Sequence, residues 1–184
     1  MKYIILSIIF FLPAYSYASV KDEIKKKLEN TNSIYFGFYQ KINDKIEKGN
    51  CKLSYPKKIY CKYDDVYNKI LVSNGRSLII NSDKIKNYLK YKLKDTALDL
   101  ILDKSFLIKK ISEIENIDEN IETYSVKLKH KDNIITIYFD KDNFDVQGWK
   151  TIDIYQNEVE TKLFDIKSNI MIDESIFKIQ KYIN

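Results

Sequence analysis

The chain has 184 residues, of which 45% are hydrophobic and 31% charged, and its formal net charge at pH 7 is +5. A chain of this length builds one domain around a single core, and a mild basic excess with interleaved lysines and acidic residues is typical of a solvated surface. A nucleic-acid interface needs clustered basic residues, so we expect no nucleic-acid partner.

The first 18 residues have the pattern of a secretory signal peptide. Lys2 precedes an apolar run from Tyr3 to Tyr15, and Ser16-Tyr17-Ala18 places small residues three and one positions before a cut after Ala18. The run is shorter than the roughly 20 apolar residues that a membrane span needs. We therefore expect residues 1–18 to be a signal peptide, residues 19–184 to form one mature domain, and the protein to be periplasmic.

One amphipathic helix is predicted after the signal peptide, and a long series of strands follows it. Residues 20–31 place Ile24 and Leu28 at helical spacing. From residue 33 onward the apolar period changes to two, through Ile34, Phe36 and Phe38. Further strands are predicted at residues 51–55, 59–63, 69–73 and 77–81, and Asn74-Gly75 between the last two is a strong hairpin signal.

The chain's two cysteines, Cys51 and Cys61, lie on two predicted strands that flank Pro56. A loop of three or five residues centred on Pro56 places them opposite each other on the apolar face of the hairpin, whereas a two-residue loop sends them to opposite faces. Directly opposite strand residues have Cα atoms about 4.5 to 5.5 Å apart, which a disulfide spans, and export favours oxidation. A disulfide is therefore expected, and two free thiols in an apolar wall are the alternative.

A second helical segment interrupts the strands. Thr96 or Asp95 is placed to cap a helix in which Leu98, Ile101 and Leu102 share a face. Strands resume at residues 123–130, 133–139, 144–147, 150–155 and 159–166, and the short turns make neighbours antiparallel. The pattern predicts an α+β fold: a single curved antiparallel sheet forms an incomplete (half) β-barrel, with two or three short helices lidding its concave face. A closed barrel is the alternative.

Catalytic and metal-binding patterns are missing from the sequence. A zinc site needs about four ligands, and only His130 accompanies the two cysteines. No neighbouring group orients His130 as a base, and the carboxylates are dispersed among lysines. We therefore expect no enzyme activity, no catalytic residue, no metal and no cofactor.

Several short motifs, taken in chain order, resemble the LolA family of periplasmic carriers of outer-membrane lipoproteins. The family's F-x-Q strand end corresponds to Phe38-Tyr39-Gln40. The family then has a glycine before a strand that ends at a proline, which corresponds to Gly49 and Pro56. Its I-L-V-S-D-G-x-x-L strand corresponds to residues 70–78. Its T-P-x-x-L-I helix corresponds to residues 96–101, and its final pattern to Asn169, Ile172 and Phe177. The chain departs from the family at Tyr55, where an arginine associated with cargo retention is common.

The resemblance implies a chaperone that binds the acyl chains of lipoproteins released from the inner membrane and delivers them to the outer membrane. It also implies acylated lipoproteins, an inner-membrane lipoprotein-releasing ABC transporter and, where present, a LolB-like outer-membrane acceptor as partners of a monomer. A non-enzymatic lipid- or lipoprotein-sensing regulatory module of the envelope is the alternative.

The side chains expected to contact acyl chains come from the apolar faces of the predicted strands and helices. They are Leu28, Phe36, Phe38, Cys51, Leu53, Ile59, Cys61, Leu98, Ile101 and Leu102. For these residues a filled core is the alternative to a lipid-accessible face.

Overall fold

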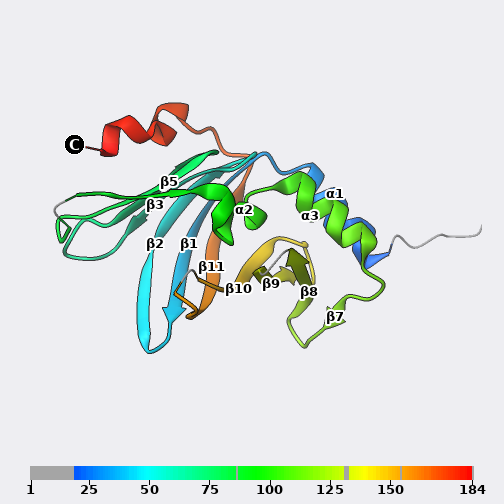
Figure 1. Ribbon diagram of the computed structural model, residues 1–184. Helices are drawn as coiled ribbons and strands as arrows, with labels where there is room; N and C mark the ends of the chain where they lie inside the picture. The colour runs from blue at the N-terminus through cyan, green and yellow to red at the C-terminus, as the bar shows by residue number, and fades with distance from the viewer. Residues whose placement is uncertain (1–18, 86, 131–132, 154, 184) are drawn as a thin grey trace, which may run out of the picture.

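The two edge strands of the sheet are far from closing on each other. The computed structural model describes residues 19–85, 87–130, 133–153 and 155–183, so the predicted signal peptide lies outside it. Within these residues eleven strands form one antiparallel sheet in the order β6-β5-β4-β3-β2-β1-β11-β10-β9-β8-β7. The sheet is curved but open, because β6 and β7 each have a strand on one side only (Figure 1). The predicted half-barrel is confirmed, and the closed barrel is excluded.

Most of the strands are connected by short turns. In chain order they are β1 (Ser33–Ile42), β2 (Lys45–Ser54), β3 (Lys58–Tyr63), β4 (Ile70–Asn74), β5 (Ser77–Asn81), β6 (Leu89–Lys92), β7 (Asp118–Glu119), β8 (Thr123–His130), β9 (Asn133–Asp140), β10 (Val146–Ile152) and β11 (Glu158–Ser168).

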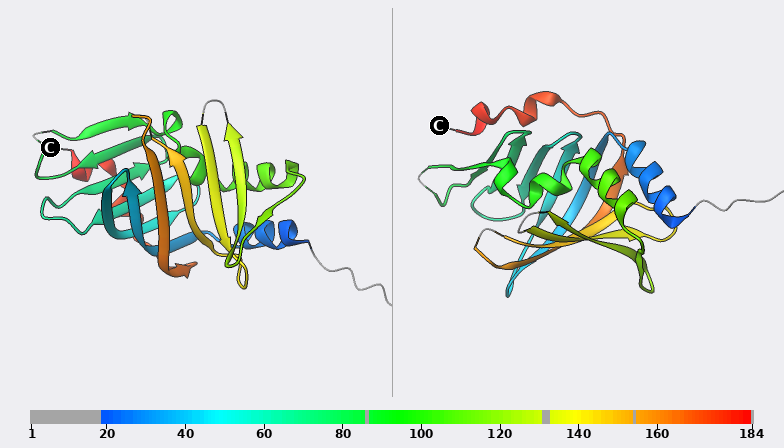
Figure 2. Two further views of the ribbon diagram at one scale, coloured as in Figure 1. Left: turned by 90° about the horizontal axis from the view of Figure 1, so that it is seen from below. Right: turned by 45° about the vertical axis from the view of Figure 1, so that its right-hand side comes forward.

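Helices lie on both faces of the sheet. The inner, concave face carries α1 (Val20–Glu29), the 3-10 turn η1 (Leu93–Asp95), α2 (Leu98–Ile101) and α3 (Lys104–Glu113) (Figure 2). The C-terminal 3-10 turns η2 (Glu174–Phe177) and η3 (Ile179–Tyr182) pack on the outer face of β3, β4 and β5. The main core therefore lies between the sheet and α1–α3, and a smaller cluster around Val72 and Ile79 lies under the C-terminal segment.

The first helix forms where its spacing predicts. The hydroxyl of Ser19 caps it by accepting a hydrogen bond from the amide of Asp22 at 3.2 Å. Acidic residues follow in the first turn and lysines in the last, as the helix dipole favours. Ile24 and Leu28 are its buried residues, so its apolar stripe is the face that holds it to the core.

The second helical segment is divided, which the sequence pattern did not indicate. Helix α2 ends at Ile101, and Asp103 starts α3 by accepting a hydrogen bond from the amide of Phe106 at 3.0 Å. An aspartate at this position competes with continuous helix by capping a new one. The break lets Leu102 be fully buried between the two helices and the sheet.

Four strand assignments need correction. The predicted strands 144–147 and 150–155 are one strand, β10, with a register shift between Val146 and Gly148. Strand β2 begins at Lys45 rather than at Cys51, and β6 and the two-residue strand β7 were missed. In these missed stretches charged and other exposed residues hide any apolar alternation, so pairing with the neighbouring strand, not side-chain pattern, makes them strands.

The cysteine hairpin has a three-residue loop, the shorter of the two predicted lengths. Ser54 pairs with Lys58, Leu53 with Ile59 and Cys51 with Cys61 across β2 and β3. The two sulfur atoms are bonded, with the Cα atoms 4.1 Å apart. The disulfide is thus confirmed over the free-thiol alternative, and it ties β2 to β3 at the inner face.

Removing this disulfide should lower the free energy of unfolding by about 3 kcal/mol, because the closed loop of about ten residues restricts the unfolded chain. The measurement is urea unfolding of the double variant Cys51→Ala, Cys61→Ala beside the native protein with and without reductant. Equal midpoints for all three samples would contradict a stabilising role.

Candidate functional site

An apolar cavity of about 250 Å³ lies between the inner face of the sheet and helix α2. Its walls come from both halves of the sheet, because β4, β5 and β6 contribute on one side and β10 and β11 on the other. The apolar lining includes Leu71, Leu78, Ile80, Leu98, Ile101, Trp149 and Val159. Concave, mainly apolar pockets with a few polar groups are the usual form of a binding site for an apolar ligand.

The structure brings all ten predicted contact residues into one cluster. Nine belong to the main core and Leu98 packs against it. Leu98 and Ile101 line the cavity, whereas the other eight are at most 5% exposed and form the packed layer around it. In this arrangement those eight are core residues, so their contact with acyl chains stays a prediction that requires the helices to move.

Several lining residues were not predicted. Leu71, Leu78 and Ile80 lie on strands that the sequence does indicate, but periodicity does not say which end of a strand borders a void. Trp149 was placed between two predicted strands, whereas it is a central residue of β10 and its ring meets Phe36 edge-on at 6.2 Å. The alternation of apolar Trp149 with charged Lys150 is the sequence pattern that could have placed Trp149 within a strand.

One end of the cavity is polar, but its charges are already paired. The Lys69 ammonium lies 2.6 Å from a Glu47 carboxylate oxygen and 4.0 Å from the centroid of the Tyr63 ring. Burial acts to raise the pKa of Glu47, but its hydrogen bonds with Lys45 and Lys69 prevail and hold that pKa below its ordinary value. Lys69 is neutralised within the protein, and the Asp153 carboxylate, which also lines the cavity, accepts hydrogen bonds from the backbone amides of Tyr155 and Asn157. The cavity therefore offers a ligand mainly apolar surface.

Two tyrosines meet across the opening of the cavity. The hydroxyls of Tyr91 on β6 and Tyr155 in the β10–β11 turn lie 3.4 Å apart, and both residues line the cavity. The hydrogen bond with Tyr155 is the main cause that raises the pKa of Tyr91, followed by burial. Because Tyr155 is 70% exposed, this contact links the two sides of the sheet at the solvent edge.

Lys57 fastens the α2–α3 junction to the sheet. Its ammonium lies 3.0 Å from Asp99 and 3.1 Å from Asp103, and its backbone amide donates to the carbonyl of Leu102 at 3.0 Å. Partial burial acts to lower the pKa of Lys57, but the hydrogen bonds that it donates to the two carboxylates outweigh burial and the pKa is raised. The β2–β3 turn is therefore a point of attachment for the helices that cover the cavity.

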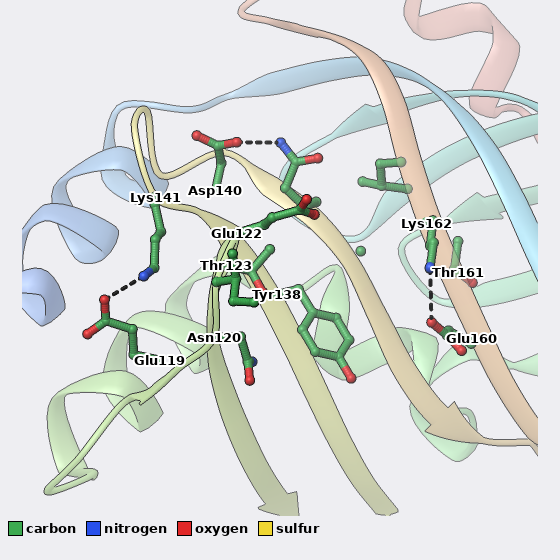
Figure 3. A pocket seen from close by; sticks show the side chains of 14 residues that line it. Glu119, Asn120, Glu122, Thr123, Tyr138, Asp140, Lys141, Glu160, Thr161 and Lys162 are labelled. Atoms are coloured by element: carbon green, nitrogen blue, oxygen red, sulfur yellow. Dashed lines mark hydrogen bonds and ion pairs between the residues drawn. The ribbon is translucent and has the colours of Figure 1, made fainter.

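The outer face carries a larger groove of about 1070 Å³, but its lining is polar (Figure 3). Tyr138 and Asp140 alternate with buried Ile137 and Phe139, which places the groove on the convex side. Two ion pairs lie in it, Lys141 with Glu119 and Lys162 with Glu160 at 3.8 Å, and the carboxylates of Glu122 and Asp140 also line it. Larger volume does not make this groove the better candidate for an acyl chain, since an apolar ligand there would lie against these charged groups.

The described part of the chain has neither the side-chain cluster of a metal site nor a helix suited to crossing a membrane. No group of three or more histidine, cysteine, aspartate or glutamate side chains there is arranged to hold a metal ion. None of the helices in the described ranges has the length and apolar character needed to cross a membrane.

Comparison with known proteins identifies the family. The sequence model of the family described as outer membrane lipoprotein carrier protein LolA matches residues 29–180, which confirms the resemblance found in the motifs. None of the curated proteins compared with the chain matches it in sequence.

Solved structures with low sequence identity share the fold. A putative outer membrane lipoprotein-sorting protein domain from Vibrio parahaemolyticus has a TM-score of 0.51 at 9% identity, over 87% of this chain and 95% of that chain. An uncharacterized conserved protein from Thermus thermophilus has a TM-score of 0.51 at 7% identity, over 84% of this chain and 90% of that chain. At such identities the likeness concerns architecture alone.

Substituting Lys57→Gln should loosen the α2–α3 junction, because both carboxylates lose their cation while the rest of the core is untouched. We expect faster amide hydrogen exchange in peptides covering residues 96–103 and no change in β8 and β9. Lys58→Gln is the matched control, since Lys58 also forms an ion pair, at 2.7 Å, but with Glu174 on the outer face. The same acceleration in both variants would contradict a specific attachment.

Proposed function

The chain belongs to the LolA family of outer membrane lipoprotein carrier proteins, and on that premise we propose that it carries acylated lipoproteins through the periplasm. It would receive them from an inner-membrane lipoprotein-releasing ABC transporter and deliver them to the outer membrane, to a LolB-like acceptor where there is one. The single observation that supports the proposal best is the apolar cavity under α2, lined by both halves of the sheet.

The size of the cavity limits what the closed form can hold. A cavity of about 150 Å³ accommodates one benzene molecule. On that scale about 250 Å³ accommodates about ten chain carbons, which is part of one acyl chain. Burying about ten methylenes contributes about 8 kcal/mol, whereas three fully enclosed chains of about sixteen carbons would exceed the practical limit of about 20 kcal/mol for noncovalent binding. Partial burial keeps the cargo releasable without a bound nucleotide.

Outward movement of the helices supplies the remaining room. Three leucines of this segment face the core and are at most 6% exposed. They are Leu100 on α2, Leu102 at the C-terminal end of α2 and Leu107 on α3. Breaking the Lys57 ion pairs would let this segment swing from the sheet and add those faces to the cavity. Closed and open arrangements then differ in their affinity for acyl chains, and the cargo shifts the population toward the open one.

Trp149 is the chain's only tryptophan and lines the cavity, so it reports on a bound ligand directly. A diacylated lipopeptide with brominated acyl chains should quench its fluorescence in a saturable titration. Leu98→Glu should weaken this binding at least about tenfold, because a carboxylate in the cavity has to be desolvated. An acidic residue at the first position of α2 is compatible with folding, since it faces the positive end of the helix.

Ile134→Glu is the matched control. Ile134 is 40% exposed on β9, one position from buried Ile135 and thus on the outer face. The same loss of affinity in both variants, or no saturable quenching of the native protein, would overturn the cavity assignment.

The carrier role itself is tested with spheroplasts. Adding the purified protein should release newly made lipoproteins from the inner membrane as a soluble complex, and Leu98→Glu should release fewer. Lipopeptide binding without any release would contradict the carrier function and favour a lipid-sensing module instead.

A further inference from the structure

Lysines that are scattered along the sequence gather on the outer face of the middle strands. Lys48 and Lys162 lie on either side of Tyr39, and Lys52 and Lys167 lie on either side of Tyr35, in the paired registers of β2, β1 and β11. Residues directly opposite in antiparallel strands share a face, and the alternate residues on β1, Phe36 and Phe38, are buried on the inner side. Lys41 on β1 and Lys62 on β3 lie on the same outer face. We call these six residues the lysine crest: Lys41, Lys48, Lys52, Lys62, Lys162 and Lys167.

The crest is positively charged and largely unpaired. All six lysines are exposed. Among the described residues Glu160 is the acidic partner of the crest, 3.8 Å from Lys162, and the other five lysines form no ion pair there. The acidic side chains Glu119, Glu122 and Asp140 line the groove beyond β11, and Lys58 with Glu174 borders the crest on the side of the C-terminal segment.

Aromatic rings lie flat between these lysines. Phe164 covers Gly37, where a Cβ atom would come within 2.3 Å of its ring, so only glycine allows the ring to lie against the strand. The Phe164 ring also contacts that of Tyr39, with centroids 4.9 Å apart and planes inclined by 30°. Tyr39 is 52% exposed and Phe164 38%, so both present apolar ring surface among the ammonium groups.

We propose that the lysine crest is a docking face for the anionic surface of a phospholipid bilayer. Strands β2, β1 and β11 occupy the middle of the eleven-stranded order, beside the strands whose outer face carries η2 and η3, and the lysines of the crest are exposed on this part of the convex face. Lysines near an anionic membrane surface and aromatic rings at the headgroup level are the two side-chain types that bind such an interface. Protein interfaces, in contrast, tend to be depleted in lysine.

Docking by the crest sets the direction in which the cavity faces relative to the membrane. Helices α1–α3 lie on the concave face of the sheet (Figure 2), whereas the crest lysines share the outward direction of Tyr35 and Tyr39, opposite to buried Phe36 and Phe38. A protein held by its crest therefore turns the covered cavity away from the lipid, toward soluble partners and not into the bilayer.

The test is co-sedimentation of the purified mature protein with vesicles. Binding is expected to vesicles of equal parts phosphatidylglycerol and phosphatidylcholine, and not to phosphatidylcholine alone. Replacing Lys48, Lys52, Lys62 and Lys162 by glutamine should weaken binding at least about a hundredfold, since each lysine near the surface contributes about fivefold. Raising the ionic strength should weaken the binding of the native protein, because exposed charges are screened.

A control with the same net charge separates the crest from charge in general. Lys90, Lys92, Lys127 and Lys129 are also exposed but lie on β6 and β8, and their replacement by glutamine should leave binding within about twofold. Equal loss in both quadruple variants, no binding to anionic vesicles, or equally tight binding of duplex DNA or of an acidic protein would overturn the proposal. Trp149 quenching by lipopeptide should be unchanged in the crest variant, so failure here is distinguishable from failure of the carrier function.

Discussion

The organisation of this protein depends on one topological constraint: strands β6 and β7 are consecutive in sequence but lie at opposite edges of an eleven-stranded sheet. The connection between them has to cross the whole width of the sheet, and it does so over the concave side as η1, α2 and α3. An open curved sheet would otherwise leave its apolar inner face in water. The crossing segment is therefore at once the second layer of the core and the cover of the cavity.

The cover is attached more firmly on one side than on the other. Near α3 the core is filled by fully or almost fully buried side chains such as Leu102, Leu107 and Ile111. Near α2 the packing is incomplete, and the space is bordered by Leu98, Ile101 and Trp149. Helix α2 is a single turn of four residues that borders this space, whereas α3 has ten residues and also packs against α1, so α2 is the part of the cover that costs less to displace.

The same strands serve the two faces of the molecule because successive side chains point in opposite directions. Phe36 and Phe38 build the inner wall, whereas Tyr35, Tyr39 and the neighbouring lysines face outward. The disulfide between Cys51 and Cys61 belongs to the inner set and fixes the register of β2 and β3. A slip by one residue would exchange the two faces, so this covalent link protects the apolar wall and the lysine crest together.

The sequence by itself determined which residues share a face and the register of the cysteine hairpin, because a period of two and local turn geometry act over a few residues. The order of short motifs along the chain indicated the family. The loop length of the hairpin, three residues and not five, was decided by the folded structure. Tertiary structure alone decided which distant strands are neighbours. It thereby placed β1 beside β11, sent α2 across the inner face, and left a void at Leu71 and Trp149 while filling the space around Leu53 and Ile59. It also gathered lysines that look dispersed along the chain, since Lys48 and Lys162 lie on either side of Tyr39 only through strand pairing. Voids and charged surfaces depend on the sum of such non-local contacts, which no local pattern records.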